Sequence, residues 1–223
     1  MFQKGICYFF ITVFLIATMA GCTASNSDLD LSKLENGGQF SFPGLRPGAS
    51  LQEVEEVLGF PLGEAIEETG PAPVYGKDNA TLLYFFPKET PFTVLGKKVS
   101  TDYTFMEDTL CTMTIGMDFD VDHPEEKEKL ISKLMELYGE PDINYTEDKP
   151  WQDSTMTVTN IRWIRESEGY YTVLACGILD LTSSGRSSYS VSLNLLYNEW
   201  TDVSELLSEY EEKLEELERK DAK

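Results

Sequence analysis

The sequence predicts an α+β fold made of two tandem repeats, each a helix followed by a three-stranded antiparallel sheet, with an amphipathic helix at the C-terminus. Two observations predict it. One helical pattern followed by three strand patterns occurs twice along the chain. Both helical patterns end at a glycine and a proline, in Gly59-Phe60-Pro61 and in Gly139-Glu140-Pro141, which are helix-stop signals. Because sequence identity between the halves is thin, a single irregular α+β domain without duplication stays open.

Residues 1–21 have the layout of an export signal. Lys4 precedes the apolar run Gly5 to Ala20, which at helical rise spans about 24 Å, less than the roughly 30 Å of a membrane core. A basic start, an apolar middle and small residues at the exit are typical of a cleaved signal peptide. The alternative is an uncleaved N-terminal helix with a cysteine after it by chance.

The stretch Thr18-Met19-Ala20-Gly21-Cys22 resembles the lipobox of bacterial lipoproteins. The resemblance implies that Cys22 becomes the first mature residue and carries a diacylglycerol with acyl chains such as palmitate. Two or more chains form a stable anchor, because each buried methylene contributes about 0.8 kcal/mol. We therefore expect a cell-membrane protein of the envelope, lipid-anchored at Cys22 on the extracytoplasmic face.

Residues 22–41 are predicted to be a flexible tether, because their polar residues and the Gly37-Gly38 pair offer little apolar surface to bury. The chain as a whole is acidic, with 39 Asp and Glu against 18 Lys and Arg and a formal net charge of −21. Such a surface repels nucleic acid and anionic lipid headgroups. We expect no nucleic-acid partner, and contact with the membrane through the lipid alone.

Residues 42–120 form the first predicted repeat. Ser50 with Glu53 three residues later is a capping-box pattern, and the apolar positions that follow share one helical face up to Gly59 and Pro61. Three runs of strand character come next, and the third alternates most regularly. These runs are Thr81 to Phe86, Lys98 to Met106 and Thr109 to Val121.

Residues 121–198 form the second predicted repeat. Asp122 with Glu125 is an acidic start signal, and a helical apolar stripe then runs to Gly139. Asp142 to Thr155 is predicted to be a loop. The strand runs that follow are Met156 to Arg165, Tyr170 to Leu181 and Ser187 to Tyr197.

Residues 199–223 contain the C-terminal helix, predicted over Asp202 to Lys220. Its apolar positions recur at four-three-four-three spacing, as in a coiled coil. Under three heptads long, it is marginal as an independent coil. Docking on the body is the favoured interpretation, and self-association is the alternative.

The segment Phe42 to Ser50, followed by Leu51 to Pro61, resembles the opening of the BamE/SmpA-type lipoprotein domain and of the repeats in β-lactamase inhibitory proteins. The resemblance implies a helical layer on one face of an antiparallel sheet. It also implies a protein-binding role without catalysis, because inhibitory proteins of this group use the open sheet face and the assembly lipoprotein binds partners in the outer membrane.

The polar side of the strand runs is the candidate partner-binding face. Short hydroxyl residues make it suited to polar contacts, although antiparallel sheets often have one merely solvated face. The candidates are Ser100, Asp102, Thr104, Thr112, Thr114, Arg162, Ser188, Ser190, Ser192 and Asn194. We expect Trp163, which alternates with Ile161, to lie in the core.

No pattern predicts catalytic, cofactor-binding or metal-binding residues. The single histidine, His123, cannot supply a multi-histidine zinc site, and no nucleotide or nucleophile motif is present. Cys111 and Cys176 lie in strand runs, where buried free thiols are the default and a disulfide is the alternative. The leading hypothesis is a non-enzymatic protein- or peptide-binding or scaffold module of the bacterial envelope. A small-molecule or cation-binding lipoprotein is the alternative, and an enzyme is the third possibility.

Overall fold

The computed structural model describes residues 27–72, 77–151, 154–180, 188–198 and 203–221. The first half contains β1 (Ser27–Asp28), η1 (Leu31–Lys33), β2 (Glu35–Asn36), β3 (Gln39–Phe40), α1 (Leu51–Leu58), β4 (Ile66–Ala72), β5 (Lys77–Phe85), β6 (Phe92–Val94), β7 (Lys97–Lys98), β8 (Ser100–Met106) and β9 (Thr109–Asp120). The second half contains α2 (Pro124–Tyr138), β10 (Ile143–Trp151), β11 (Ser154–Ser167), β12 (Tyr170–Asp180), β13 (Ser188–Asn198) and α3 (Val203–Asp221).

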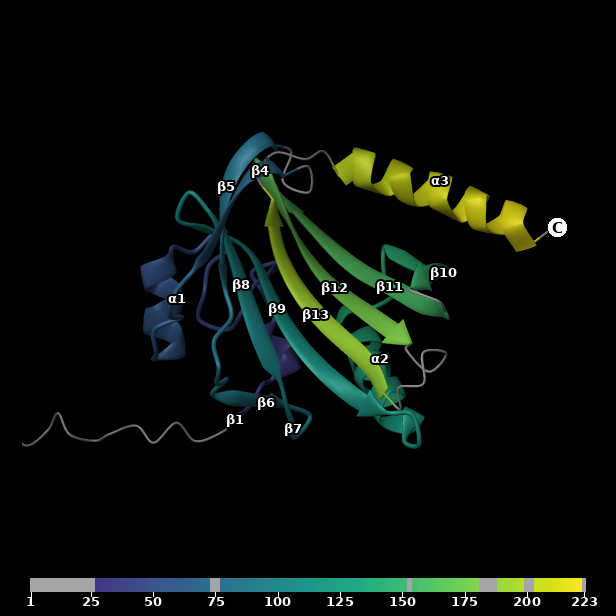
Figure 1. Cartoon of the computed structure of the whole chain (residues 1–223), viewed down its shortest axis with the longest axis horizontal. Helices are drawn as coiled ribbons and strands as arrows, with labels where there is room; N and C mark the ends of the chain where they lie inside the picture. Colours follow the sequence, from purple (N-terminus) through teal and green to yellow (C-terminus); the bar gives the residue numbers. More distant parts are fainter. Residues whose placement is uncertain (1–26, 73–76, 152–153, 181–187, 199–202, 222–223) are drawn as a thin grey trace, which may run out of the picture.

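One antiparallel sheet of eight strands dominates the molecule, in the order β10-β11-β12-β13-β9-β8-β5-β4 (Figure 1). The prediction of two helix-plus-three-strand repeats is therefore wrong, because the strands of both halves belong to this one sheet. Each half contributes four strands to the shared sheet, and in each half one helix, α1 or α2, precedes these four strands. The last strands of the two halves, β9 and β13, pair with each other from Ser188↔Asp120 to Leu196↔Thr112, so the two meanders meet at the centre.

The two strands missing from the prediction are the edge strands of this sheet. β4 has the sequence IEETGPA and β10 has INYTEDKPW. Both are polar and contain a proline, Pro71 or Pro150, which cannot donate a ladder hydrogen bond and is tolerated at an edge. Charge and proline protect sheet edges from pairing with other chains, but they also remove the apolar alternation by which a strand is recognised.

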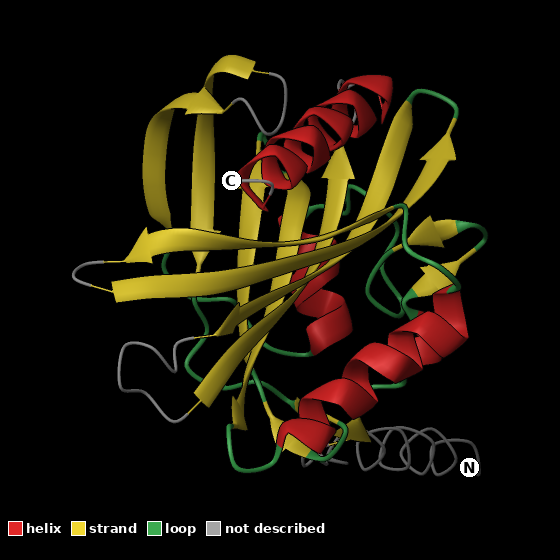
Figure 2. Ribbon diagram, turned by 90° about the vertical axis from the view of Figure 1, so that its right-hand side faces the viewer, coloured by secondary structure: helices red, strands yellow, loops and turns green. Residues whose placement is uncertain are grey.

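One face of the sheet, which we call the covered face, carries the core. α1 and α2 pack on it, and Figures 1 and 2 show α2 on the opposite side of the sheet from α3. Trp163 is fully buried, as predicted, and its indole Nε1 donates to the carbonyl of Gly139 at 2.9 Å. The other fully buried strand residues of this face include Tyr103, Met113, Ile115, Leu174 and Leu193.

The N-terminal segment is part of this core, so the prediction of a flexible tether is wrong for residues 27–41. Leu34 and Phe40 are buried, and the Phe40 amide donates to Thr172 Oγ1 at 2.9 Å. The Tyr138 hydroxyl of α2 donates to the carbonyl of Leu31. A few widely spaced apolar residues are enough to order this segment because they are buried in the same core cluster as α2 and the sheet. Residues 1–26, including the predicted signal peptide and Cys22, lie outside the described residues.

The helix starts show one confirmed and one wrong prediction. At α1 the capping box forms: Ser50 Oγ accepts from the Glu53 amide, and the Glu53 carboxylate accepts from the Ser50 amide. At α2 the predicted cap, Asp122, does not act; His123 is the N-cap residue and makes no side-chain cap hydrogen bond. Both helices end at a glycine with positive φ, Gly59 and Gly139, as predicted.

Cys111 and Cys176 are buried free thiols, and burial raises the pKa of Cys176 to about 12. Within the described ranges, no helix combines the length and apolar character needed to cross a membrane.

Candidate binding site on the open face of the sheet

The opposite side of the sheet, which we call the open face, carries the predicted binding residues. Strand register places Arg162, Ala175, Asn194, Thr114 and Asp102 in one row across β11, β12, β13, β9 and β8. Four of these five residues were predicted candidates. The register therefore brings residues far apart in sequence into one continuous line.

The remaining candidates lie in the neighbouring rows. Ser192 and Ser100 both lie opposite Gly116, and Thr112 lies opposite Thr104. Ser190 pairs with Asp118 and Ser188 with Asp120, although the side chain of Ser188 is outside the described part of the structure. All ten candidates thus share the open face, and of those with described side chains only Thr104 is buried.

The centre of the open face is a hydrogen-bonded polar group. Thr114 Oγ1 donates to Asn194 Oδ1 at 2.9 Å, and Asn194 Nδ2 donates to Ser192 Oγ at 3.1 Å. These bonds fix the Asn194 amide in one orientation. A ligand therefore meets a pre-oriented set of donors and acceptors at this point, which lowers the entropy cost of binding.

Glycines keep the floor of this region low. A Cβ on Gly116 would lie 2.7 Å from Ser100 Oγ, and a Cβ on Gly177 would lie 3.0 Å from Ser192 Oγ. The backbone φ at neither position needs glycine, so the serine hydroxyls lying over these residues are the observed constraint. The serine hydroxyls thus occupy the space that a side chain at Gly116 or Gly177 would take, and they lie close to the sheet backbone.

Asp102 ends the central row in an environment that disfavours its charge. Burial raises the pKa of the Asp102 carboxyl, and the neighbouring Thr114 hydroxyl offsets only part of the rise. A half-buried carboxylate of this kind is better stabilised when a donor reaches it.

The open face also carries apolar residues that the sequence analysis did not assign to it. They lie on β11, β12 and β13, and each is buried or half-buried. Their alternation with the core residues was the available signal, although β12 is apolar at most of its positions and shows that alternation poorly. They are Met156, Val158, Ile164, Val173, Leu179 and Leu196.

α3 flanks the open face at the β10 edge. The Tyr210 ring stacks on Tyr145 with centroids 5.9 Å apart, and the Tyr210 hydroxyl donates to the carbonyl of Asn144 at 3.1 Å. Lys213 reaches Glu147 at 2.7 Å. The helix therefore docks on the body, as the favoured interpretation expected.

Glu147 is the buried anchor of that contact, with 8% of its surface exposed. Lys149 lies 2.9 Å from one of its oxygens and Lys213 2.7 Å from the other. Burial acts to raise the pKa of Glu147, but hydrogen bonds from the two lysines outweigh it and the pKa is lowered overall. The same contact raises the pKa of Lys213.

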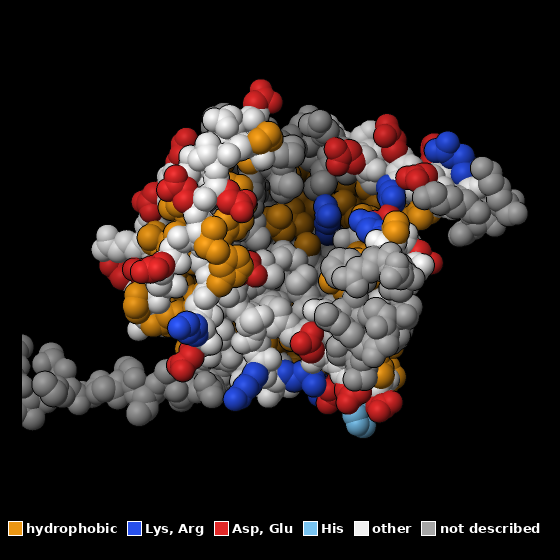
Figure 3. Space-filling model, viewed as in Figure 1, with side chains coloured by type: hydrophobic (Ala, Val, Ile, Leu, Met, Phe, Trp, Pro, Cys, Tyr) orange, Lys and Arg blue, Asp and Glu red, His pale blue; other side chains and the backbone are white. Residues whose placement is uncertain are grey.

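A pocket of about 360 Å³ lies between α3 and the sheet. Figure 3 shows this side of the molecule hollowed between β4–β5 and α3, with Lys and Arg side chains gathered toward α3 and Asp and Glu side chains over β4–β5. The hollow is thus polarised although the whole chain is acidic. The pocket is lined by Ile143, Tyr145, Glu147, Lys149, Arg162, Glu209, Tyr210 and Lys213.

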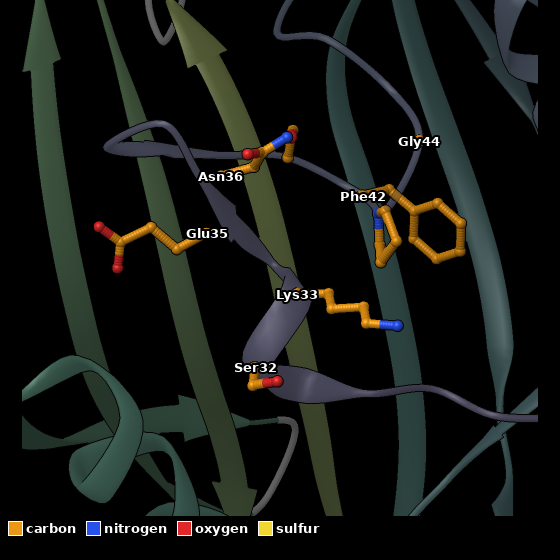
Figure 4. Close-up of a pocket in the computed structure, with 8 residues that line it drawn as sticks. Ser32, Lys33, Glu35, Asn36, Phe42 and Gly44 are labelled. Atoms are coloured by element: carbon orange, nitrogen blue, oxygen red, sulfur yellow. The ribbon is translucent and has the colours of Figure 1, made fainter.

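Two further hollows lie away from the open face. Figure 4 shows one of about 230 Å³ beside the N-terminal segment, in which the Glu35 and Lys33 side chains point in different directions. Glu35 pairs with Arg165 at 3.0 Å and Lys33 with Asp30 at 3.8 Å, so their charges do not converge on a ligand. The other, of about 780 Å³, is formed by the segments that follow α1 and β5, and its lining includes the exposed Phe86.

The described residues contain no group of three or more His, Cys, Asp or Glu side chains that could hold a metal ion. His123 is exposed at the start of α2, with Nδ1 3.2 Å from Glu125 Oε1. Comparisons with known proteins gave no relative: no protein-family model, curated protein or solved structure matches the chain.

Proposed function

We propose that the protein is a bacterial envelope lipoprotein, anchored at Cys22 on the extracytoplasmic side of the cell membrane, whose open face binds an extended segment of a protein or peptide without catalysing a reaction. The observation that carries the binding role is the open face itself. It combines a pre-oriented polar centre, glycines in the neighbouring strand positions and half-buried apolar residues on one side of the sheet.

A merely solvated sheet face would have a different composition. Solvated faces of antiparallel sheets are predominantly polar, whereas this one carries apolar side chains such as Leu179 and Leu196 beside the polar row. Apolar surface rimmed by polar residues is typical of an interaction site. An extended chain suits the hollow because backbone amides can bond to Asn194 and Ser192 while side chains meet the apolar residues.

The proposed membrane localisation is tested by fractionation of cells that make the full chain. We expect the wild-type protein in the membrane fraction, labelled by a clickable palmitate analogue, and Cys22→Ala unlabelled and released from membranes. A wild-type protein found in the cytosol with residues 1–21 intact contradicts this part of the proposal.

The binding role is tested by affinity purification from detergent-solubilised membranes. Asn194→Trp places a large side chain over the glycine floor, and Glu128→Trp places the same side chain on the exposed surface of α2 as the control. We expect a defined partner to be enriched with wild type and Glu128→Trp, and lost with Asn194→Trp. Equal recovery with both variants removes the open face from the proposal.

A further inference from the structure

Arg162 is the one cation of the central row, and within the described part of the chain no ion pair joins it to a carboxylate. Arg46 lies 3.0 Å from Glu53 and Arg165 3.0 Å from Glu35. Among the residues that the structure describes, no Asp or Glu carboxylate lies within ion-pair distance of Arg162. In a chain with 39 acidic residues, a half-buried guanidinium left without such a partner is unexpected on grounds of stability alone.

The nearby acidic residues do not fill that role. Glu147 lines the same pocket, but its two oxygens are already taken by Lys149 and Lys213. Glu209 also lines the pocket, from an exposed position on α3. The lining of the pocket includes three cations and two carboxylates, and Lys213 also reaches Glu216 at 3.4 Å. Both lysines are therefore paired, and Arg162 is the cation of this pocket with no ion pair among the described residues.

The walls of the pocket favour binding of a carboxylate by the Arg162 guanidinium. The stacked pair of Tyr145 and Tyr210 and the buried Ile143 exclude water from one side. Charge-assisted hydrogen bonds are stronger than neutral ones, and the guanidinium fork fits a carboxylate with two parallel bonds. A volume of about 360 Å³ accommodates a carboxylate together with an adjoining apolar side chain.

The row geometry connects this pocket to the polar centre. Arg162, Ala175, Asn194 and Thr114 lie on four adjacent strands, so Arg162 and Thr114 are roughly 14 Å apart at the usual strand spacing. A fully extended peptide covers that distance in about four residues. Ala175 lies between Arg162 and Asn194 in this row, and its small side chain leaves room for a peptide to cross the sheet there.

We propose that the pocket at Arg162 binds a carboxylate of the peptide ligand, whose chain then runs across Ala175 to Asn194 and Thr114. The inference rests on the proposed function, which supplies a peptide as the ligand. It adds that a carboxylate is the group of the peptide that the protein recognises. The carboxylate comes either from the C-terminus of the ligand or from an acidic side chain.

Three synthetic peptides separate these sources. The first is N-acetyl-trialanyl-phenylalanine as the free acid, whose phenylalanine suits the tyrosine wall. The second is its carboxamide, and the third is the carboxamide with glutamate in place of the first alanine. Binding of each to the purified chain is measured by NMR titration at neutral pH.

We expect at least one carboxylate peptide to bind about tenfold more tightly than the plain carboxamide, in line with a bidentate charge-assisted contact. Preference for the free acid identifies a terminal carboxylate, and preference for the glutamate peptide identifies a side-chain one. Arg162→Gln should abolish the difference, Arg162→Lys should retain part of it, and Arg219→Gln, on the exposed surface of α3, should leave it intact.

The inference is overturned by equal affinity for all three peptides, or by a carboxylate preference that survives in a folded Arg162→Gln protein. Absence of any shift at millimolar peptide overturns it as well. Equal affinity with shifts at Asn194 would still support the proposed function, and the membrane purification with Asn194→Trp decides that function independently.

Discussion

The side chains on the two faces of the sheet differ in the contacts that they make. On the covered face, alternate residues of β9, β11, β12 and β13 join one continuous apolar cluster with α1, α2 and the N-terminal segment. On the open face, the intervening residues mix hydrogen-bonded polar groups with half-buried apolar ones, and α3 packs at the β10 edge. The comparison indicates that stability comes mainly from the covered face, and the open face is the surface to which the proposed function assigns the partner.

The largest difference is expected from one substitution made on each face of β12. Leu174 is fully buried on the covered face, and Leu179 is half-buried on the open face. Leu174→Ala should lower the free energy of unfolding by about 2–5 kcal/mol because it leaves a cavity in the core. Leu179→Ala should cost roughly 1 kcal/mol, since little area is lost. Urea denaturation measures both, and equal losses would contradict the comparison.

The contact between α3 and β10 should respond to pH. The pKa of Glu147 is lowered in the folded protein, so its contribution is present above the unfolded value of about 4.3 and is lost as pH falls through the folded value. Limited trypsin digestion at neutral pH should release α3 several-fold faster in Glu147→Gln than in wild type. Glu212→Gln, exposed on α3, is the matched control, and faster cleavage in both would assign the effect to the helix alone.

The contribution of the Asp102 carboxyl to stability should depend on pH in the opposite direction to that of Glu147. The pKa of Asp102 is raised by burial, so ionisation above the unfolded value of about 3.9 lowers stability slightly. Asp102→Asn should therefore raise the free energy of unfolding modestly at pH 7, and the gain should shrink as pH falls below both pKa values. A loss of stability at pH 7 would mean that the carboxylate has a favourable partner on the open face.

The smallest change in stability is expected at the glycine floor. Gly177→Ala places a methyl 3.0 Å from Ser192 Oγ, which can move by a few tenths of an ångström. The free energy of unfolding should change by less than about 0.5 kcal/mol, whereas partner recovery should fall because the floor is raised. Calorimetry and the membrane purification measure the two effects separately; unchanged recovery would exclude close approach at this point.

The sequence predicted the centre of the molecule better than its edges. Strict alternation in β8, β9 and β13 was enough to assign Thr114, Asn194 and their neighbours to one face. β4 and β10 were missed because proline and charge, which protect an edge, hide the strand pattern. The pocket could not be foreseen either: it depends on α3 returning to β10, and no local pattern pairs Lys213 with Glu147.

Site-specific photo-crosslinking from the two sides of the sheet tests the central claim most directly. A benzophenone side chain is introduced in the full chain at Ser192 on the open face, or at Lys133 on the exposed surface of α2, and cells are irradiated. The account predicts one defined adduct from position 192, absent from position 133 and suppressed by Asn194→Trp. An adduct from position 133 alone, or an adduct from position 192 that Asn194→Trp leaves unchanged, would contradict it.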